Sequence, residues 1–266
     1  MLAESPQPQI SYDEAGNGPP LVLLHAFPQT RLMWRRQLAE LSASFQVLCP
    51  DLPPVGESRS SSTCSIEGMA DDIAAWLEHL SIPKATVGGV SMGGYVALAL
   101  ARRHPALLSG LILADTRAEP DDEPARSNRQ TMIEFARHNN ARALFEKMAP
   151  RLFCEGTRSE HPELIEEAAQ IAVPIASESI IALIEALRDR PDARPGLASI
   201  HVPALILVGA EDEVTPPEAA QAMSAAIANS QLQVLERAGH FAHIEQALAW
   251  NRAVLDWARG VASARS

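Results

Sequence analysis

Residues 87–100 read VGGVSMGGYVALAL, and this stretch decides the fold. An apolar, β-like run over residues 85–90 meets an alanine-rich, helical run over residues 92–103, and Ser91 lies at the junction. Glycines two positions away on each side complete the pattern Gly-x-Ser-x-Gly. A serine in so sharp a turn has strained backbone angles, and only small residues fit at those two flanking positions. The pattern predicts a nucleophilic serine; an ordinary tight turn with an incidental serine is the alternative.

Similar apolar runs recur along the chain, separated by helical patterns. The strand-like runs cover residues 21–24, 45–49, 85–90, 111–114, 205–208 and 232–235. The helical patterns cover residues 34–41, 66–80, 92–104, 217–228 and 248–258. Runs that are apolar throughout, rather than alternating, indicate strands covered on both faces, as in a parallel sheet. We therefore expect a doubly wound α/β fold with a mostly parallel sheet, and a short extra strand at residues 10–13.

One long stretch interrupts this alternation. Residues 118–195 show no strand pattern, only helical periodicity interrupted at Pro150, Pro162 and Pro174. We expect an α/β core of residues 1–117 and 196–266 and an inserted helical lid of residues 118–195. Such an insertion lies over the carboxyl ends of the strands, where open α/β sheets bind ligands. Its apolar residues would then form substrate walls. A helical subdomain without a role in substrate binding is the alternative.

A nucleophilic serine needs a base, usually a histidine that a carboxylate orients. His240 follows the last strand-like run and precedes the final helix, so we expect it on the same rim as Ser91. His243, three residues later, is the alternative base. Asp212 follows the run at residues 205–208, and the order Ser, Asp, His suits Gly-x-Ser-x-Gly on an α/β sheet. The alternative acids are Glu211, Glu213 and Asp115.

The negative charge that develops on an attacked carbonyl oxygen needs at least two backbone donors. We expect one donor to be the N–H of Met92, directly after the serine. The other should be the N–H of Phe27, in the loop after the first long strand, because Pro28 has no N–H. The side chains of Phe27, Pro28 and Met92 are expected to contact the substrate.

Composition and charge exclude several classes of function. A formal charge of −11 provides no basic face for nucleic acid or for an anionic membrane. Cys49, Cys64 and Cys154 are far apart and in no metal-ligand spacing, so we expect neither a disulfide nor a metal site. The first six residues, MLAESP, lack a basic region and an apolar region, and no run of eighteen apolar residues follows. We expect a cytoplasmic location, with homo-oligomerisation left open.

These motifs together resemble the α/β-hydrolase superfamily nearly end to end. Residues 25–28, HAFP, resemble its His-Gly-x-Pro oxyanion loop, and residues 51–58, DLPPVGES, resemble its Asp-x-x-Gly-x-Gly-x-Ser segment. Residues 89–93, Asp212 and residues 238–240 resemble its nucleophile, acid and histidine motifs. The chain departs from the pattern at two positions where the superfamily has glycine, Ala26 and Pro54. Within the superfamily it is most similar to small bacterial carboxylesterases, 3-oxoadipate enol-lactonase-like hydrolases and cofactor-free haloperoxidases or perhydrolases.

The resemblance implies a serine hydrolase that needs no cofactor and cleaves carboxylic esters through an acyl-enzyme. The few aromatic residues and the aliphatic insertion suggest small to medium acyl groups. Enol-lactone hydrolysis is the first alternative. A carboxylate-bearing lactone would need a cationic partner, and the candidates, which could equally be solvated surface residues, are Arg31, Arg117, Arg126 and Arg129. A perhydrolase, in which Pro28 would favour peroxide over water, and a non-catalytic ligand sensor on the same fold are also compatible with these motifs.

Overall fold

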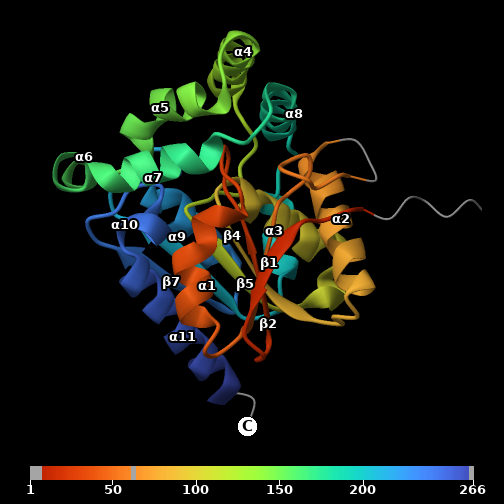
Figure 1. Cartoon of the computed structure of the whole chain (residues 1–266). Helices are drawn as coiled ribbons and strands as arrows, with labels where there is room; N and C mark the ends of the chain where they lie inside the picture. Colours follow the sequence, from red (N-terminus) through yellow and green to blue (C-terminus); the bar gives the residue numbers. More distant parts are fainter. Residues whose placement is uncertain (1–7, 61–63, 264–266) are drawn as a thin grey trace, which may run out of the picture.

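Seven strands form one sheet in the computed structural model, which describes residues 8–60 and 64–263 (Figure 1). The strands are β1 (Tyr12–Ala15), β2 (Pro20–Leu24), β3 (Gln46–Pro50), β4 (Ala85–Val90), β5 (Leu108–Ala114), β6 (Ala204–Gly209) and β7 (Ser230–Leu235). Their order is β1-β3-β2-β4-β5-β6-β7, and only β1 pairs antiparallel. The predicted doubly wound, mostly parallel α/β sheet is confirmed. Residues 1–7, on which the expected lack of a targeting segment partly depends, lie outside the described residues.

Helices cover both faces of this sheet. They are α1 (Arg35–Leu41), α2 (Ile66–His79), α3 (Met92–Arg103), α9 (Pro217–Ala226), α10 (Ala242–Glu245) and α11 (Ala247–Ser263). Helices α1 and α11 lie in front of the sheet in Figure 1, and α3 and α9 lie behind it. The central strands β2, β4, β5 and β6 are almost entirely buried because both of their faces are covered. The extra strand starts at Tyr12, two residues later than predicted, and the last helix extends five residues further.

Helix α3 approaches the sheet so closely that only glycine fits at the contact. A Cβ on Gly93 would lie 2.1 Å from the carbonyl oxygen of Leu24 at the end of β2. A Cβ on Gly89 would lie 2.2 Å from the backbone carbonyl of Gly93. The two glycines therefore let the start of α3 rest against the ends of β2 and β4, which places Ser91 at this edge of the sheet.

Five helices connect β5 to β6 and lie along the upper edge of the sheet in Figure 1. They are α4 (Glu123–His138), α5 (Ala141–Leu152), α6 (Glu155–Glu160), α7 (Pro162–Ala172) and α8 (Ser177–Arg188). Pro162 begins α7, and Pro174 lies between α7 and α8, but the predicted interruption at Pro150 is wrong. Pro150 lies inside α5, only two residues before its end, where the N–H that proline lacks removes a single bond near the terminus.

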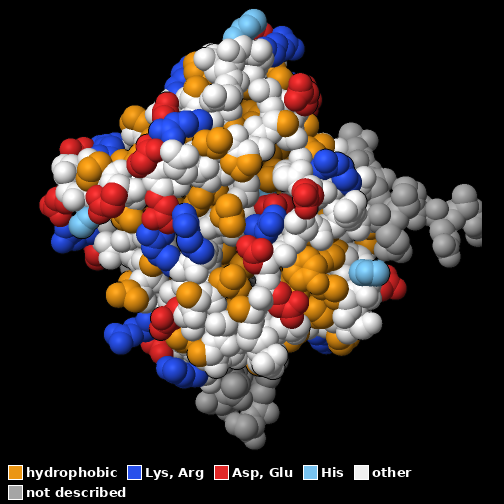
Figure 2. Space-filling model, in the orientation of Figure 1, with side chains coloured by type: hydrophobic (Ala, Val, Ile, Leu, Met, Phe, Trp, Pro, Cys, Tyr) orange, Lys and Arg blue, Asp and Glu red, His pale blue; other side chains and the backbone are white. Residues whose placement is uncertain are grey.

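Acidic and basic side chains are interspersed over the face of the molecule that Figure 2 shows. Many of them pair, for example Arg36 with Glu167 and Arg103 with Asp71. Within residues 8–60 and 64–263, no single helix is long and apolar enough to cross a bilayer. Helices α7 and α8 are long and apolar enough only when taken together, and they are bent by 103° relative to each other.

Replacing Gly89 by alanine tests the close approach of α3. We expect Gly89→Ala to lower the free energy of unfolding by about 3 kcal/mol, because the new methyl group overlaps the backbone of Gly93. Gly260→Ala on α11 is the matched control, since its Cβ would meet nothing within 4 Å. The control should raise stability by about 0.5–1 kcal/mol through helix propensity. Urea unfolding measures both, and equal stabilities for the two variants would contradict the packing described.

Candidate active site

Ser91 has the strained backbone that its motif predicts. Its φ is 52° and its ψ is −111°, in a region that L-residues rarely adopt. The turn is fixed by hydrogen bonds on both sides. The N–H of Ser91 donates to the carbonyl oxygen of Ala114 at 3.0 Å, and the carbonyl of Ser91 accepts from the N–H of Tyr95 and from the hydroxyl of Thr116. The residue is partly exposed, so the hydroxyl is presented at the edge of the sheet rather than packed inside it.

The segments that carry the other candidate residues start at the same edge. In the sheet register, Val90 of β4 is opposite Ala114 of β5, and Ala114 is opposite Leu207 of β6. Further along, Gly209 of β6 is opposite Leu235 of β7. Parallel strands lie about 4.8 Å apart, so the loops after β4, β5, β6 and β7 are adjacent.

Asp212 and His240 form a buried, hydrogen-bonded pair. Nδ1 of His240 and Oδ2 of Asp212 are 2.9 Å apart, and the two side chains are 0% (Asp212) and 2% (His240) exposed. The other carboxylate oxygen, Oδ1, accepts from the backbone N–H groups of Val214 and Thr215 at 2.8 and 2.9 Å. A proton on Nδ1 directed at the carboxylate leaves Nε2 as the basic nitrogen of the neutral ring.

The electrostatics of this pair keep Asp212 ionised. Burial alone would raise the pKa of Asp212, but His240 and the hydrogen bonds from Thr215 outweigh that effect and hold it below its usual range. The hydroxyl of Thr215 donates to Oδ2 of Asp212 at 2.7 Å and lies 3.2 Å from Nδ1 of His240. Asp212 is thus an acceptor that can orient an imidazole and stabilise its protonated form.

Ser91 is not hydrogen-bonded to His240. Among the hydrogen bonds of residues 8–60 and 64–263, the ring of His240 has partners in Asp212 and Thr215 only. Nucleophile–base hydrogen bonds are often long without substrate and tighten in the substrate complex. The structure thus joins the expected acid and base, and it places the expected nucleophile on the same edge of the sheet.

Asp115, the alternative acid at the end of β5, has a different environment. Its Oδ1 accepts from the N–H of Gly209 at 2.9 Å, and the backbone of Ala242 also interacts with this buried carboxyl group. Burial, together with the nearby charge of Asp212, raises the pKa of Asp115 well above its usual range. Two neighbouring carboxyl groups cannot both ionise cheaply, so the proton resides on Asp115 and the charge on Asp212.

The two glutamates beside Asp212 lie outside this pair. Glu211 and Glu213 are both exposed, and the backbone carbonyl of Glu213 accepts from Arg151. Neither carboxylate is hydrogen-bonded to the ring of His240, whose hydrogen-bond partners in the described part of the chain are Asp212 and Thr215. An exposed carboxylate is surrounded by water, which weakens its interaction with an imidazolium. Asp212 is therefore the acid that the structure favours.

His243, the alternative base, is enclosed by aromatic rings in the core. It is fully buried between Trp34 and Phe241, with ring centroids 5.0 and 5.5 Å away. Burial, reinforced by His240, lowers the pKa of His243 to about 3. Neither of its ring nitrogens has a partner among the described side chains and backbone groups. His243 is thus a neutral, packed ring rather than a base presented at the edge of the sheet.

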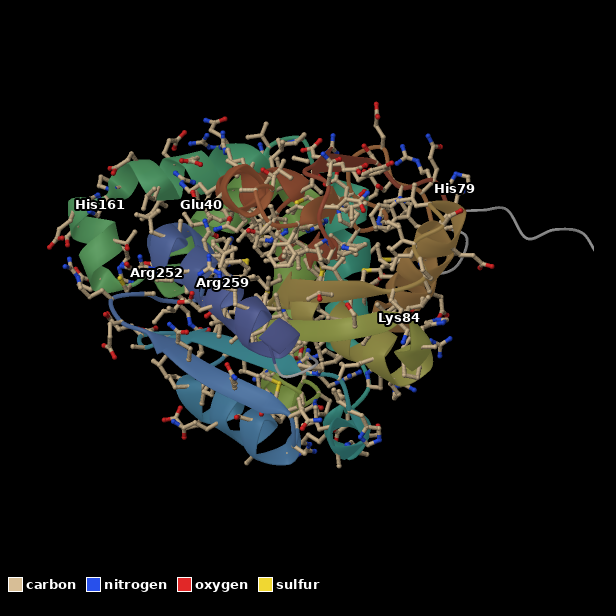
Figure 3. All side chains as sticks on the ribbon, turned by 90° about the horizontal axis from the view of Figure 1, so that it is seen from below. Glu40, His79, Lys84, His161, Arg252 and Arg259 are labelled. Carbon is tan, nitrogen blue, oxygen red and sulfur yellow. The ribbon has the colours of Figure 1, made fainter. Side chains whose placement is uncertain are left out.

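None of the other histidines is hydrogen-bonded to Ser91, Asp212 or His240 among the described residues. His79 and His161 lie near opposite sides of the view in Figure 3, on α2 and between α6 and α7. His25 is buried, and its Nε2 accepts from the N–H of Leu52 at 2.9 Å, so it fastens the loop after β2 to the loop after β3. Burial lowers the pKa of His25, which keeps the ring neutral in this role.

The loop after β2 carries the second expected oxyanion donor. Phe27 and Pro28 are buried, and the N–H of Gln29 donates to the carbonyl of Ala26 at 2.9 Å, which closes a tight turn around them. The N–H groups of Phe27 and Met92 donate to none of the residues whose hydrogen bonds the structure describes. Met92 is the first residue of α3, where N–H groups have no partner within the helix. Both groups are thus available to a developing oxyanion.

Both departures from the superfamily pattern have a structural context. The N–H of Ala26 donates to the sulfur of Met33 at 3.2 Å. Pro54 lies in the loop that Asp51 opens, and its carbonyl accepts from the hydroxyl of Ser179 on α8 at 2.9 Å. The loop therefore contacts the helical insertion.

Two residues that the sequence analysis missed support the base. Thr215 bridges the acid and the base, and its position three residues after Asp212 is the spacing of a local side-chain turn. Glu245 accepts from the N–H of Gly239 at 2.7 Å and from the N–H of Cys154 at 2.9 Å. No local sequence signal predicts the second contact, because Cys154 is 91 residues away. The described residues contain no group of three or more His, Cys, Asp or Glu side chains placed to hold a metal ion.

Comparison with known proteins gives consistent results. A sequence profile of the alpha/beta hydrolase fold matches residues 19–247. The chain is 31% identical to 3-oxoadipate enol-lactonase 2 of Acinetobacter baylyi over 89% of this chain and 87% of that protein. A thermophilic esterase from Thermogutta terrifontis, solved with malate bound, superimposes with a TM-score of 0.90 at 40% identity and covers 95% of this chain and 93% of its own. The enol-lactonase from Burkholderia xenovorans superimposes with a TM-score of 0.86 at 29% identity, and the match covers 94% of this chain and 96% of that one.

The pH dependence of stability tests the protonation of Asp115. The pKa of Asp115 is raised in the native state, so the native protein holds this proton more tightly than the unfolded chain does. The contribution of Asp115 to the free energy of unfolding is therefore fully present below its unfolded pKa of about 4 and is lost as the pH rises. Asp115→Asn removes this proton linkage. The stability of the variant relative to wild type should increase above pH 4 by up to about 1.4 kcal/mol per pH unit. Urea unfolding at several pH values measures this difference, and a difference independent of pH would refute the assignment.

Proposed function

The chain belongs to the α/β-hydrolase fold family and is a hydrolase, and on this premise we propose that it cleaves carboxylic esters through an acyl-enzyme. Ser91 is the nucleophile, His240 the general base and acid, and Asp212 the residue that orients the imidazole. The observation that carries the proposal is the buried bond between His240 and Asp212, at the same edge as a serine with φ of 52°.

In the first half of the reaction, Oγ of Ser91 attacks the ester carbonyl while its proton passes to Nε2 of His240. The imidazolium is stabilised by Asp212 through Nδ1, and the oxyanion accepts from the N–H groups of Met92 and Phe27. When the intermediate collapses, the bond between carbonyl carbon and alkoxy oxygen breaks, and Nε2 returns the proton to the leaving alcohol. Water then attacks the acyl-enzyme with the same base, which releases the acid and restores Ser91.

The helical insertion serves as a lid in this proposal, with residues 1–117 and 196–266 as the core. Its α5 carries Leu152, whose carbonyl accepts from the N–H of Phe241, next to the proposed base. Most of the apolar stripe of α8 is buried, including Ile180 and Leu183, so that helix packs inward rather than toward solvent. Aliphatic walls of this kind suit small to medium acyl groups, and the side chains of Phe27, Pro28 and Met92 would meet the substrate from the core.

Ser91→Ala tests the nucleophile. We expect the turnover number for p-nitrophenyl butyrate to fall at least about 1,000-fold, because no covalent intermediate can form. Labelling by a fluorophosphonate should be lost at the same time. The matched control is Ser199→Ala, an exposed serine at the end of a 3-10 helix, which should leave both unchanged. A Ser91→Ala enzyme that hydrolyses the ester at the wild-type rate would refute the mechanism.

Lactone hydrolysis is the second candidate function, favoured by the likeness to two enol-lactonases. A lactone is a cyclic ester, so the same serine, base and oxyanion donors would open the ring. The chemistry differs only in that the leaving alcohol stays attached to the acyl group throughout, so that water releases a single hydroxy acid.

A neutral lactone compared with its open-chain ester separates the two functions. We expect δ-valerolactone and ethyl pentanoate to be hydrolysed with specificity constants within about 200-fold of each other, since one extra or missing contact is worth about 1–3 kcal/mol. Both rates should be lost in Ser91→Ala. Turnover of the ester without any turnover of the lactone would restrict the enzyme to open-chain substrates.

A further inference from the structure

A cleft of about 460 Å³ lies between α4, α5 and the loop after β6, and its lining is unusually basic for this chain. Four cationic side chains line it, which are those of Arg117, Arg129, Lys147 and Arg151. Asp121 is the only acidic side chain among its lining residues, all of which are described. The lining therefore has a formal charge of +3, in a protein whose total charge is −11.

The centre of this charge is a cluster in which three arginines share one carboxylate. Asp121 accepts from Arg190 at 2.6 Å, from Arg129 at 2.9 Å and from Arg117 at 3.1 Å, and its side chain is fully buried. Burial alone would raise the pKa of Asp121, but Arg129 and Arg190 outweigh this effect and keep it ionised. One carboxylate balances only one guanidinium, so the cluster has an excess of positive charge that an anionic ligand would balance.

The arginines of the cluster differ in how fully their donors are used. Arg190 is 3% exposed, bonds the carbonyls of Leu187 and Glu119, and lies 4.3 Å from the ring centroid of Tyr95. It is therefore a structural residue. Arg129 bonds Asp121 through Nε, and neither of its Nη nitrogens donates to a group within the described residues. Its outer edge presents two parallel N–H groups, the geometry that matches a planar carboxylate.

The other two candidate arginines are already paired. Arg31 bonds Asp13 and Asp51, and Arg126 bonds Asp189 and the carbonyl of Arg188. Of the four arginines considered from the sequence, only Arg117 and Arg129 line the cleft.

Two lining residues connect the cleft to the loops that carry the proposed catalytic residues. Val214 lines it, and the backbone N–H of Val214 donates to Asp212. Arg117 directly follows Thr116, whose hydroxyl donates to the carbonyl of Ser91. The lining also contains the apolar side chains of Met132, Leu144, Met148 and Leu152. A ligand that fits has an apolar chain with an anionic end.

We propose that this cleft binds a carboxylate at the far end of the acyl chain, so that the preferred substrates are half-esters of aliphatic dicarboxylic acids. The cleavage of the ester group rests on the proposed function, whereas the binding of a carboxylate in the cleft is independent of it. Arg129, assisted by Arg117, holds the carboxylate, and the aliphatic wall covers the chain that leads to the scissile carbonyl.

The activity test compares two esters with the same leaving group and similar chain length, p-nitrophenyl hydrogen adipate and p-nitrophenyl hexanoate. For wild type, we expect kcat/KM to be at least about tenfold higher for the adipate half-ester, the value of a charge-assisted hydrogen bond. Arg129→Gln should lower this ratio about tenfold, and Lys147→Gln about threefold. Arg126→Gln, on the same helix but outside the cleft, removes one positive charge as a matched control and should leave the ratio unchanged.

A binding test separates the cleft from catalysis. We expect calorimetry with Ser91→Ala to detect adipate but neither 1,6-hexanediol nor inorganic phosphate at the same concentration, and Arg129→Gln should abolish the signal. Adipate binding without any ester turnover would uphold the cleft and refute the proposed hydrolysis. A wild-type ratio of one or less, equal losses in Arg126→Gln and Arg129→Gln, or binding of phosphate in place of adipate would overturn the cleft. If Arg129→Gln fails to fold, the ratio for Lys147→Gln decides, since the ammonium of Lys147 lies 4.6 Å from the ring centroid of Phe135 and forms no ion pair within the described residues.

Discussion

The close approach of α3 to the sheet is the constraint on which the rest of the structure depends. Gly89 and Gly93 leave no space for side chains between the helix start and the ends of β4 and β2. This contact forces Ser91 into its strained conformation and brings the N–H of Met92 to the same edge as the loop of Phe27. The proposed nucleophile and the two proposed oxyanion donors, from segments more than sixty residues apart in the sequence, are thereby held by packing rather than by flexible side chains.

The helical insertion helps to hold the loop that carries His240, the proposed base. The carbonyl of Leu152 accepts from the N–H of Phe241, and Glu245 bonds the N–H groups of both Cys154 and Gly239. The residue after His240 is therefore bonded to the end of α5, and the residue before it is linked to Cys154 through Glu245. If the insertion acts as the proposed lid, it could not move as a whole without moving the histidine loop, so an opening motion would be confined to the parts of the insertion beyond this attachment.

Electrostatic environments separate residues of the same type into different roles. Asp212 and Asp115 are neighbours, but hydrogen bonds and an imidazole keep the first ionised, while burial and the charge of the first keep the second protonated. The arginines around Asp121 also differ in their roles. Arg190 is buried and directs its hydrogen bonds at the protein. Arg129 lines a cleft whose lining residues have a formal charge of +3, and its Nη nitrogens donate to no group within the described residues. A strongly acidic chain can thus offer an anion a basic site.

The sequence by itself determined the features that local patterns encode. Apolar runs and helical periodicity predicted the sheet and its covering helices, and one glycine-flanked serine predicted the strained turn, because both depend on residues within a few positions of each other. It also proposed Asp212 and His240 by their places after strands, without showing that they touch. Only the tertiary structure decided that Thr215 and Glu245 support them, that Asp121 collects three arginines, and that α5 continues through Pro150. Three of the deciding contacts are long-range: Asp212 and His240 are 28 residues apart, Asp121 and Arg190 are 69 apart, and Glu245 and Cys154 are 91 apart. Their free energy depends on burial and distance, which no local pattern contains.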